Sequence, residues 1–232
     1  MERIDKIVSN QIGYSRKEVK ELIRQKRIKV NNKVISNSNE KIDETVDLIF
    51  IDNEQIKIKK YLYIILNKPK GYISASQDDN MPTVIDLIPK RYQHRNLFPA
   101  GRLDKDTTGM MIITDDGKFA HEILSPKKHV EKKYFVQIDK EITLEMIQEF
   151  QKGIILKEGI CKPAKVEKIT DNTGIVTITE GKYHQIKRMF AHYQAEVLNL
   201  KRLSMGNLFL PQDLKEGECR ELTIEELQKI KE

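Results

Sequence analysis

The segment 98–117, FPAGRLDKDTTGMMIITDDG, contains the residues best placed to do chemistry. Two glycines, Gly101 and Gly109, bracket a short stretch that holds Asp104, and an apolar run, 110–113, follows at once. A carboxylate on a glycine-flanked loop that leads into a buried strand is held rigidly while it faces a cleft, as a catalytic acid, base or nucleophile requires. Asp in such loops also caps turns through the backbone, so this segment alone leaves a structural role open.

The composition narrows the class of protein. The 232 residues suffice for one large domain or two modest ones, and 39% hydrophobic residues support a core. A net charge of +6 fits nucleic-acid binding without establishing it. Cys161 and Cys219 lie far apart and the five histidines lack metal-ligand spacing, so we expect no metal and a reducing compartment. No apolar run approaches the roughly 18 residues of a membrane span, and the polar N-terminus lacks a signal peptide, which together predict a cytoplasmic protein.

Residues 1–58 are predicted to form a separate small module. Ser15 and Glu18 have the spacing of a capping box, which starts a helix. Two short strands around Asn31-Asn32 and a further strand over 46–51 follow it. The segment 16–33 has eight Lys and Arg against two Glu, which favours a surface that tracks phosphates over an ordinary solvated helix face. The cations that we expect to align on one face are Arg16, Lys20, Arg24 and Arg27.

Residues 59–232 alternate strands with a few helices, without a strict strand–helix–strand order. A mostly antiparallel mixed sheet flanked by helices, an α+β fold, is therefore expected rather than a doubly wound one. The predicted strands are 63–66, 110–114, 134–138, 165–169, 175–179 and 197–200, and the predicted helices are 84–88, 118–124, 144–152, 185–193 and 224–230.

Three more stretches could take part in chemistry. Lys68 lies in the basic turn 67–72, where an exposed turn and a phosphate contact are equally good interpretations. Tyr134 starts an apolar strand after Glu131-Lys132-Lys133, a place where tyrosine is usually a core or interface residue. The segment 180–189, EGKYHQIKRM, leads from a strand into a helix rich in cations, and anions favour such helix starts.

Taken together, these segments resemble one family. Gly101-Arg102-Leu103-Asp104 with the residues to Gly109 resembles the central motif of the pseudouridine synthases of the RsuA and RluA type. The stretches 131–134 and 180–189 resemble the second and third motifs of that family, and the first module resembles the S4-like RNA-binding domain. The third motif, with Tyr183-His184-Gln185, is most similar to the branch that modifies small-subunit rRNA. Mild departures, such as Met110-Met111 in place of leucines, do not touch the chemistry.

The resemblance implies isomerisation of a uridine in RNA to pseudouridine, a reaction that needs no cofactor and no metal. Asp104 matches the essential carboxylate of the family, which acts as a nucleophile on the sugar or as the base that removes a sugar proton. Lys187, with Arg188 as the fallback, is the expected cation that keeps Asp104 charged in a cleft. Tyr134 matches the tyrosine that stacks on the target base and is a candidate to take the C5 proton. Arg102 is placed to fill the space that the flipped base leaves.

The resemblance also implies the partners. The expected partner is rRNA, and specifically the 16S rRNA of a small-subunit assembly particle. We expect a monomer that binds it without an obligate protein partner. Phosphate contacts orient such an RNA without reading its sequence. The further RNA-binding residues that we expect are Lys68, His184, Gln185 and Arg188, together with Arg16, Lys20, Arg24 and Arg27.

Three other interpretations compete with this one. A large-subunit rRNA synthase of the same family differs only in its substrate. A non-catalytic ribosome-assembly factor of the S4 type would not need Asp104, Tyr134 or Lys187. All three are present, which argues against this interpretation. A glycoside or nucleoside hydrolase would need paired carboxylates on two sides of the scissile bond. Asp104 and Asp106 on one loop give no reason to expect that arrangement.

Overall fold

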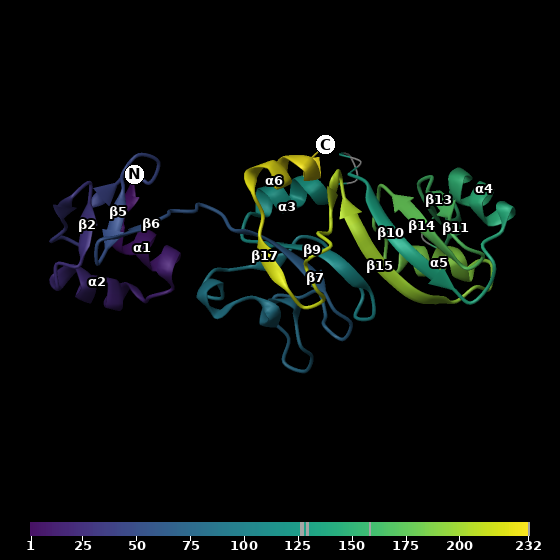
Figure 1. Cartoon of the computed structure of the whole chain (residues 1–232), viewed down its shortest axis with the longest axis horizontal. Helices are drawn as coiled ribbons and strands as arrows, with labels where there is room; N and C mark the ends of the chain where they lie inside the picture. Colours follow the sequence, from purple (N-terminus) through teal and green to yellow (C-terminus); the bar gives the residue numbers. More distant parts are fainter. Residues whose placement is uncertain (126–127, 129, 158, 232) are drawn as a thin grey trace. The chain divides into compact units, whose positions relative to one another are not determined.

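The computed structural model describes all residues except 126, 127, 129, 158 and 232. The chain separates into two compact units, coloured by sequence in Figure 1. The first comprises Met1–Tyr61 with Ile88–Asn96, and the second comprises Leu62–Leu87 with Leu97–Glu232. In the described part of the chain, no helix has both the length and the apolar character needed to cross a membrane.

Two short helices and a small sheet make up the first unit. The capping box predicted at Ser15 is present, because the hydroxyl of Ser15 accepts a hydrogen bond from the Glu18 amide and the Glu18 carboxylate accepts one from the Ser15 amide. The helices pack on the sheet through a core of buried aliphatic residues. The elements are β1 (Glu2–Arg3), α1 (Ile4–Ile12), α2 (Arg16–Arg24), β2 (Ile28–Val30), β3 (Lys33–Val34), β4 (Lys41–Ile42), β5 (Ile49–Ile51) and β6 (Glu54–Ile56), with a sheet order β3-β2-β5-β6 and a separate β1–β4 pair.

The predicted stripe of four cations is wrong at its last member. Helix α2 ends at Arg24, and Lys26 takes a left-handed conformation with a φ of 59°, so Arg27 lies beyond the helix. Its guanidinium is bound to the carboxylate of Asp52 through two hydrogen bonds. The members of the predicted stripe that lie on α2 are Arg16 and Lys20, which are exposed, and Arg24, which forms an ion pair with Glu21 at 2.9 Å.

A later segment of the chain, 88–96, belongs to the first unit, which no sequence pattern indicates. It contains the short helix η2 (Lys90–Tyr92). The ring of His94 lies against Gly13, where a Cβ would come within 2.7 Å of the ring, and its Nε2 is 2.9 Å from the Asn10 carbonyl. The Arg95 guanidinium donates hydrogen bonds to the carbonyls of residues 59 and 60. The segment is thus attached to the end of α1 and to residues 59 and 60.

The second unit is built on one mixed sheet, in which the described residues form nine strands. The order is β13-β14-β10-β15-β9-β7-β17, with β16 paired to β15 and β8 paired to β9. All pairs are antiparallel except β15 with β9. The α+β architecture predicted from the sequence is confirmed. The strands are β7 (Tyr63–Lys68), β8 (Phe98–Pro99), β9 (Thr108–Thr114), β10 (Lys132–Ile138), β13 (Lys165–Lys168), β14 (Thr173–Ile178), β15 (Val197–Met205), β16 (Leu208–Phe209) and β17 (Cys219–Glu221), and a separate hairpin pairs β11 (Ile155–Leu156) with β12 (Gly159–Ile160).

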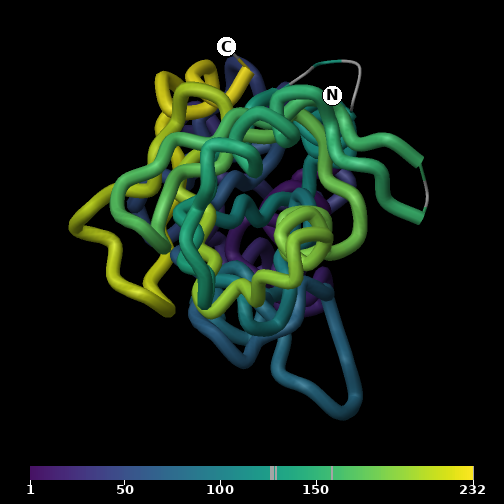
Figure 2. Tube along the Cα trace, turned by 90° about the vertical axis from the view of Figure 1, so that its right-hand side faces the viewer, coloured from purple at the N-terminus to yellow at the C-terminus, as the bar shows by residue number. Residues whose placement is uncertain are grey.

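Helices cover both halves of this sheet. Helices α3 (Gly117–Leu124) and α6 (Ile224–Lys231) lie side by side near β7 and β9, where they share a buried core (Figure 1). Helices α4 (Leu144–Lys152) and α5 (Gln185–Ala191) pack on the other half of the sheet, α4 against β13 and α5 against β15. Helix α5 is seen nearly end-on, in yellow-green, in Figure 2. The segment predicted as a helix over 84–88 is a single 3-10 turn, η1 (Val84–Leu87), and Pro89 disfavours a helical conformation at the residue before it.

Candidate active site

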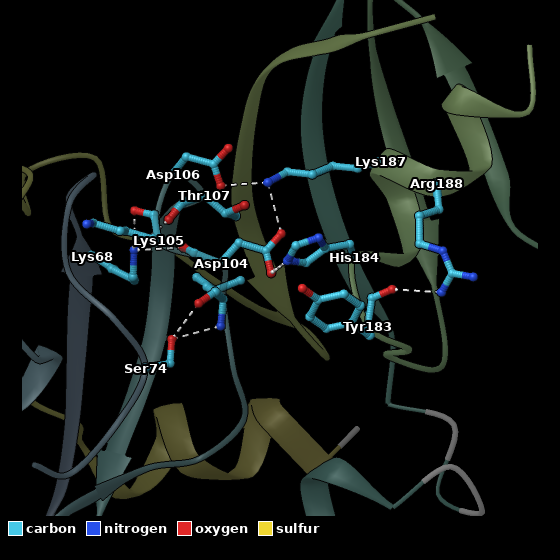
Figure 3. A network of polar contacts seen from close by, with 11 residues as sticks. Lys68, Ser74, Asp104, Lys105, Asp106, Thr107, Tyr183, His184, Lys187 and Arg188 are labelled. Carbon is cyan, nitrogen blue, oxygen red and sulfur yellow. Dashed lines mark hydrogen bonds and ion pairs between the residues drawn. The ribbon is translucent and has the colours of Figure 1, made fainter. Parts of the chain in front are cut away.

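The loop that carries Asp104 runs from β8 to β9 and is clamped by its neighbours. The Ser74 hydroxyl donates to the Leu103 carbonyl at 2.7 Å and accepts from the Leu103 amide at 2.9 Å (Figure 3). The amide of Thr107 donates to the Asp104 carbonyl at 3.1 Å, which closes a turn within the loop. The residue before and the residues after Asp104 are therefore both fixed, which limits the freedom of its side chain.

Gly109 explains how β9 approaches β15 so closely. It has a φ of +97°, and a Cβ at this position would lie 2.3 Å from the carbonyl oxygen of Arg202. Only glycine combines that backbone conformation with this contact. The parallel pair of β9 and β15 brings the Asp104 loop next to the strand that carries Arg202.

Lys68 is buried and binds the same loop. Its predicted contact with RNA phosphate is therefore wrong. Its side chain is 0% exposed, at the end of β7. The ammonium donates hydrogen bonds to the carbonyls of Pro69, Asp104, Lys105 and Thr107 at 2.9–3.3 Å. Burial lowers the pKa of Lys68 to about 8, although the charges of the nearby carboxylates oppose this effect. Lys68 therefore acts on the loop and is not available to a phosphate.

The carboxylate of Asp104 faces the start of α5 (Figure 3). One of its oxygens, Oδ2, lies 3.0 Å from the ammonium nitrogen of Lys187, and Oδ1 lies 3.3 Å from Nε2 of His184. The same ammonium is 2.6 Å from Asp106. The loop and the helix thus meet through a charged cluster, and the structure brings together the carboxylate and the cation that the sequence singled out.

The ion pairs of Lys187 shift its own pKa and that of Asp106. Burial lowers the pKa of Lys187, but the hydrogen bonds to Asp106 and Asp104 outweigh it, so the pKa is raised overall. For Asp106, burial raises the pKa, and the bond from Lys187 more than offsets this, so the pKa is lowered overall. Both shifts favour the charged forms. In the folded protein, Lys187 is therefore a cation near neutral pH.

The turn before α5 holds His184 in an unusual conformation. Its φ of 47° lies in the left-handed region, which a non-glycine residue adopts at a cost and which clusters at functional sites. The ring stacks on Tyr183 at 3.8 Å, and the Tyr183 side chain is 69% exposed. The neighbouring Arg188 is half-buried and donates to the Tyr183 carbonyl.

Gln185, predicted to touch RNA, is instead used inside the motif. It is buried, its amide nitrogen donates to Glu180 at 2.9 Å, and its oxygen accepts from the Lys182 amide at 2.9 Å. Glu180 also accepts from the amide of Lys162. Gln185 therefore fixes the shape of the turn, because both ends of its amide already have partners.

A cavity of about 690 Å³ opens beside Asp104. Its walls include Tyr134 from β10, Lys187 from α5 and the exposed Arg102 from the loop. The side chain of Tyr134 is buried, with one side on this cavity. Three predicted site residues from different elements, together with Asp104, thus share one cavity. Arg16, Lys20 and Arg24 belong to the other unit.

Two further cations on this cavity escaped the sequence analysis. Arg202 on β15 and Lys132 on β10 both line it, and both are buried. The strand predicted over 197–200 stops before Arg202, and the sequence singles out Lys132 only as part of the stretch 131–134. In the structure β15 continues to Met205 and buries Leu200, Arg202 and Ser204, but the sequence of this stretch, LKRLS, has no alternation of apolar residues that would have indicated it. Among the residues that the structure describes, no group of three or more His, Cys, Asp or Glu could hold a metal ion.

Comparison with known proteins agrees with this geometry. The family model for RNA pseudouridylate synthase matches residues 62–192, which include the whole charged cluster. The chain belongs to the RNA pseudouridylate synthase family. The synthase is thus an isomerase that acts on RNA. A model for the S4 domain matches residues 2–48, so an S4 domain precedes the catalytic domain.

The relatives match the synthase over its full length. It is 41% identical to an RNA pseudouridine synthase of Bacillus subtilis (strain 168), over 99% of this chain and 98% of the relative. It is 37% identical to the ribosomal small subunit pseudouridine synthase A of Escherichia coli (strain K12), over 98% and 99%. A crystal structure of a pseudouridylate synthase, at 36% identity, superposes with a TM-score of 0.70 and covers 99% of this chain and all of the other.

Proposed function

We propose that the enzyme converts one uridine of small-subunit ribosomal RNA, the 16S rRNA of an assembly particle, to pseudouridine. The observation that carries the chemistry is the ion pair of Asp104 and Lys187 on the wall of the cavity that also contains Tyr134. Full-length similarity to proteins named ribosomal small subunit pseudouridine synthase A supports the choice of RNA. The proposed site of action is the cytoplasm, where ribosomes assemble.

In this proposal Asp104 is the group that acts on the sugar. An ionised carboxylate can attack the anomeric carbon or remove a sugar proton, and either route breaks the bond between C1′ and N1. The ammonium of Lys187 lies 3.0 Å from the carboxylate and stabilises a negative charge there. Lys187 is thus proposed to keep Asp104 charged.

Tyr134 and Arg102 are proposed to act on the base and on the gap that it leaves. A uridine must leave its stack to reach a cavity, and the ring of Tyr134 offers a surface on which the flipped base can stack. Arg102 is exposed two residues before Asp104 and is long enough to enter the vacated space. The exposed stack of Tyr183 on His184 offers a further platform for a neighbouring nucleotide.

The S4 domain is proposed to position the RNA through phosphates. Arg16 and Lys20 are exposed on α2, and Arg24 is paired with a carboxylate on the same exposed helix. Such contacts provide affinity that depends on salt and not on sequence. Specificity is then left to the RNA structure around the flipped uridine.

Pseudouridine mapping tests the proposal. The purified enzyme is incubated with unmodified small-subunit and large-subunit rRNA, each alone and within assembly particles, and pseudouridine is located by carbodiimide labelling and primer extension. We expect one new stop in small-subunit RNA, absent with Asp104→Asn. A stop only in large-subunit RNA would overturn the choice of substrate. No stop on any RNA, with RNA binding intact, would point to an assembly factor without catalysis.

A further inference from the structure

The cavity is also lined by two buried cations that do not take part in the ion pair of Asp104 and Lys187. Both come from strands of the sheet. Arg202 is 2% exposed and Lys132 is 6% exposed, and both line the cavity. Neither forms an ion pair with a carboxylate in the described part of the chain, and among the described residues Asp104 is the only carboxylate on the cavity wall. Two buried like charges without a counter-ion are costly unless a ligand supplies the negative charge.

The sheet places both cations next to Tyr134. Lys132 lies two positions earlier on β10 and therefore on the same face of the sheet. Arg202 lies directly across from Tyr134 on β15. This pairing requires an irregularity, because the register of the two strands shifts between Lys133 and Tyr134, so that Arg202 rather than Leu203 stands opposite the tyrosine. Such shifts are common beside active sites, where they re-aim a side chain.

Each cation is oriented by one hydrogen bond and keeps donors to spare. Nε of Arg202 donates to the Met110 carbonyl at 2.6 Å, which fixes the plane of the guanidinium. The Nη2 atom of the same side chain is buried and has no hydrogen-bond partner among the described residues. The Lys132 ammonium donates to the Val130 carbonyl at 2.9 Å, which leaves two of its three protons. A buried donor without a partner is costly, and in a ligand cavity it marks a place where the ligand accepts.

The reaction creates an acceptor of the matching kind. When the bond between C1′ and N1 breaks, its electron pair stays on N1, and the base becomes an anion whose charge is shared by N1, O2 and O4. The base then turns and C5 bonds to C1′, after which C5 loses its proton and N1 gains one, so that the product is an isomer of the substrate. Between these steps the base has no covalent bond to the RNA and must be held.

We propose that Arg202 and Lys132 hold the detached uracil anion by its ring oxygens while it turns beside Tyr134. The planar guanidinium of Arg202 suits one carbonyl oxygen of the base at a fixed position. The ammonium of Lys132 is a rotatable donor, which can stay bonded to the other carbonyl oxygen as the base turns. Stabilising the leaving base also assists cleavage, because these donors act where charge develops. Burial, and next the charge of Arg202, lower the pKa of Lys132 to about 8, as expected for two neighbouring cations that lack a counter-ion. The inference rests on the proposed placement of the base beside Tyr134.

Binding of free bases tests this without any RNA, so its outcome is independent of which RNA the enzyme modifies. The probes are uracil, which is neutral near neutral pH, and 5-nitrouracil, whose ring is ionised there. We expect the wild-type enzyme to bind 5-nitrouracil about tenfold more tightly than uracil or better, since hydrogen bonds to charged groups are the strong ones. Arg202→Met and Lys132→Met should each remove most of that preference. Arg202→Lys, which keeps the charge but loses the planar fork, should retain part of it.

Matched controls separate this role from general charge and from folding. Lys182 is another cation on the cavity wall, and Lys182→Met should leave the ratio of the two affinities unchanged. Asp104→Asn should keep the preference for the anion while it abolishes turnover, which separates the two proposals. Thermal unfolding checks that each variant is folded, and Lys132→Met keeps the test decisive if Arg202→Met does not fold. Equal binding of the two bases by the wild type, or a preference that survives in the folded variants, overturns the proposal.

Discussion

The ammonium nitrogen of Lys187 lies 3.0 Å from a carboxylate oxygen of Asp104, although a loop and a helix far apart in the sequence carry them. Asp104→Asn removes the charge with little change in shape. We expect single-turnover pseudouridine formation to fall at least about a thousandfold, as for other essential catalytic groups. RNA affinity, measured by filter binding, should stay near the wild-type value. A variant that keeps substantial activity would remove Asp104 from the mechanism.

Asp106 provides the matched control, because it binds the same ammonium at 2.6 Å but is not on the cavity wall. Its bond to Lys187 is one of the causes of the raised lysine pKa. In Asp106→Asn that pKa falls, so we expect the loss of activity at alkaline pH to begin at a lower pH. Near neutral pH the rate should drop by less than about tenfold, since exposed ion pairs are weak. The pH–rate profile of single turnovers measures both effects. An unchanged alkaline limb would mean that Lys187 does not control it.

Lys68→Met should destabilise the second unit. It removes a buried donor from the carbonyls of Pro69 and of three residues of the Asp104 loop, and the carbonyls of Pro69 and Thr107 lose the side-chain hydrogen bond that satisfies them. Each unsatisfied buried group costs on the order of 1–3 kcal/mol, so we expect a loss of about 3 kcal/mol or more in the free energy of unfolding. Urea denaturation measures it. Lys105→Met, at an exposed position of the same loop, is the control and should change stability little. Equal stabilities would contradict the anchoring role.

The ionisation of Lys68 also predicts a dependence of stability on pH. Its pKa is lowered from 10.5 to about 8 in the folded protein, chiefly by burial. Between these two values the unfolded chain holds the proton and the folded chain does not, so this group makes the folded protein more stable as pH rises. The wild type should therefore gain stability relative to Lys68→Met on going from pH 8 towards 10.5. Denaturation of both proteins across that range measures the difference, and a constant difference would contradict the lowered pKa.

The cations on α2 should set the salt dependence of RNA binding. Arg16→Glu with Lys20→Glu should weaken binding and lower the salt slope by about two, roughly one per lost phosphate contact. The single-turnover rate on saturating RNA should not change. Lys41→Glu with Lys57→Glu makes the same change in charge at exposed positions outside the helix and should have less effect on the slope. Identical salt slopes for the two double variants would assign no special role to α2.

Local patterns predicted much of this molecule. The capping box at Ser15 starts a helix, the run 110–113 is a buried strand, and the residues of the central and third motifs meet at one site. Local patterns failed where a distant partner decides. Lys68 looks like an exposed basic turn, yet most of its carbonyl partners lie on the loop near Asp104. Arg27 continues the helical spacing of cations, yet it binds Asp52 in the turn between β5 and β6. The position of Arg202 depends on a register shift, which no spacing within one strand reveals.

The return of residues 88–96 to the first unit has a consequence for engineering. The S4 domain and the catalytic domain are covalently interleaved, because each is made of two separate stretches of chain. A chimera that takes its RNA-binding part from a relative must therefore exchange two segments together. Swapping residues 1–61 alone would leave His94 facing a foreign surface in place of Gly13 and Asn10.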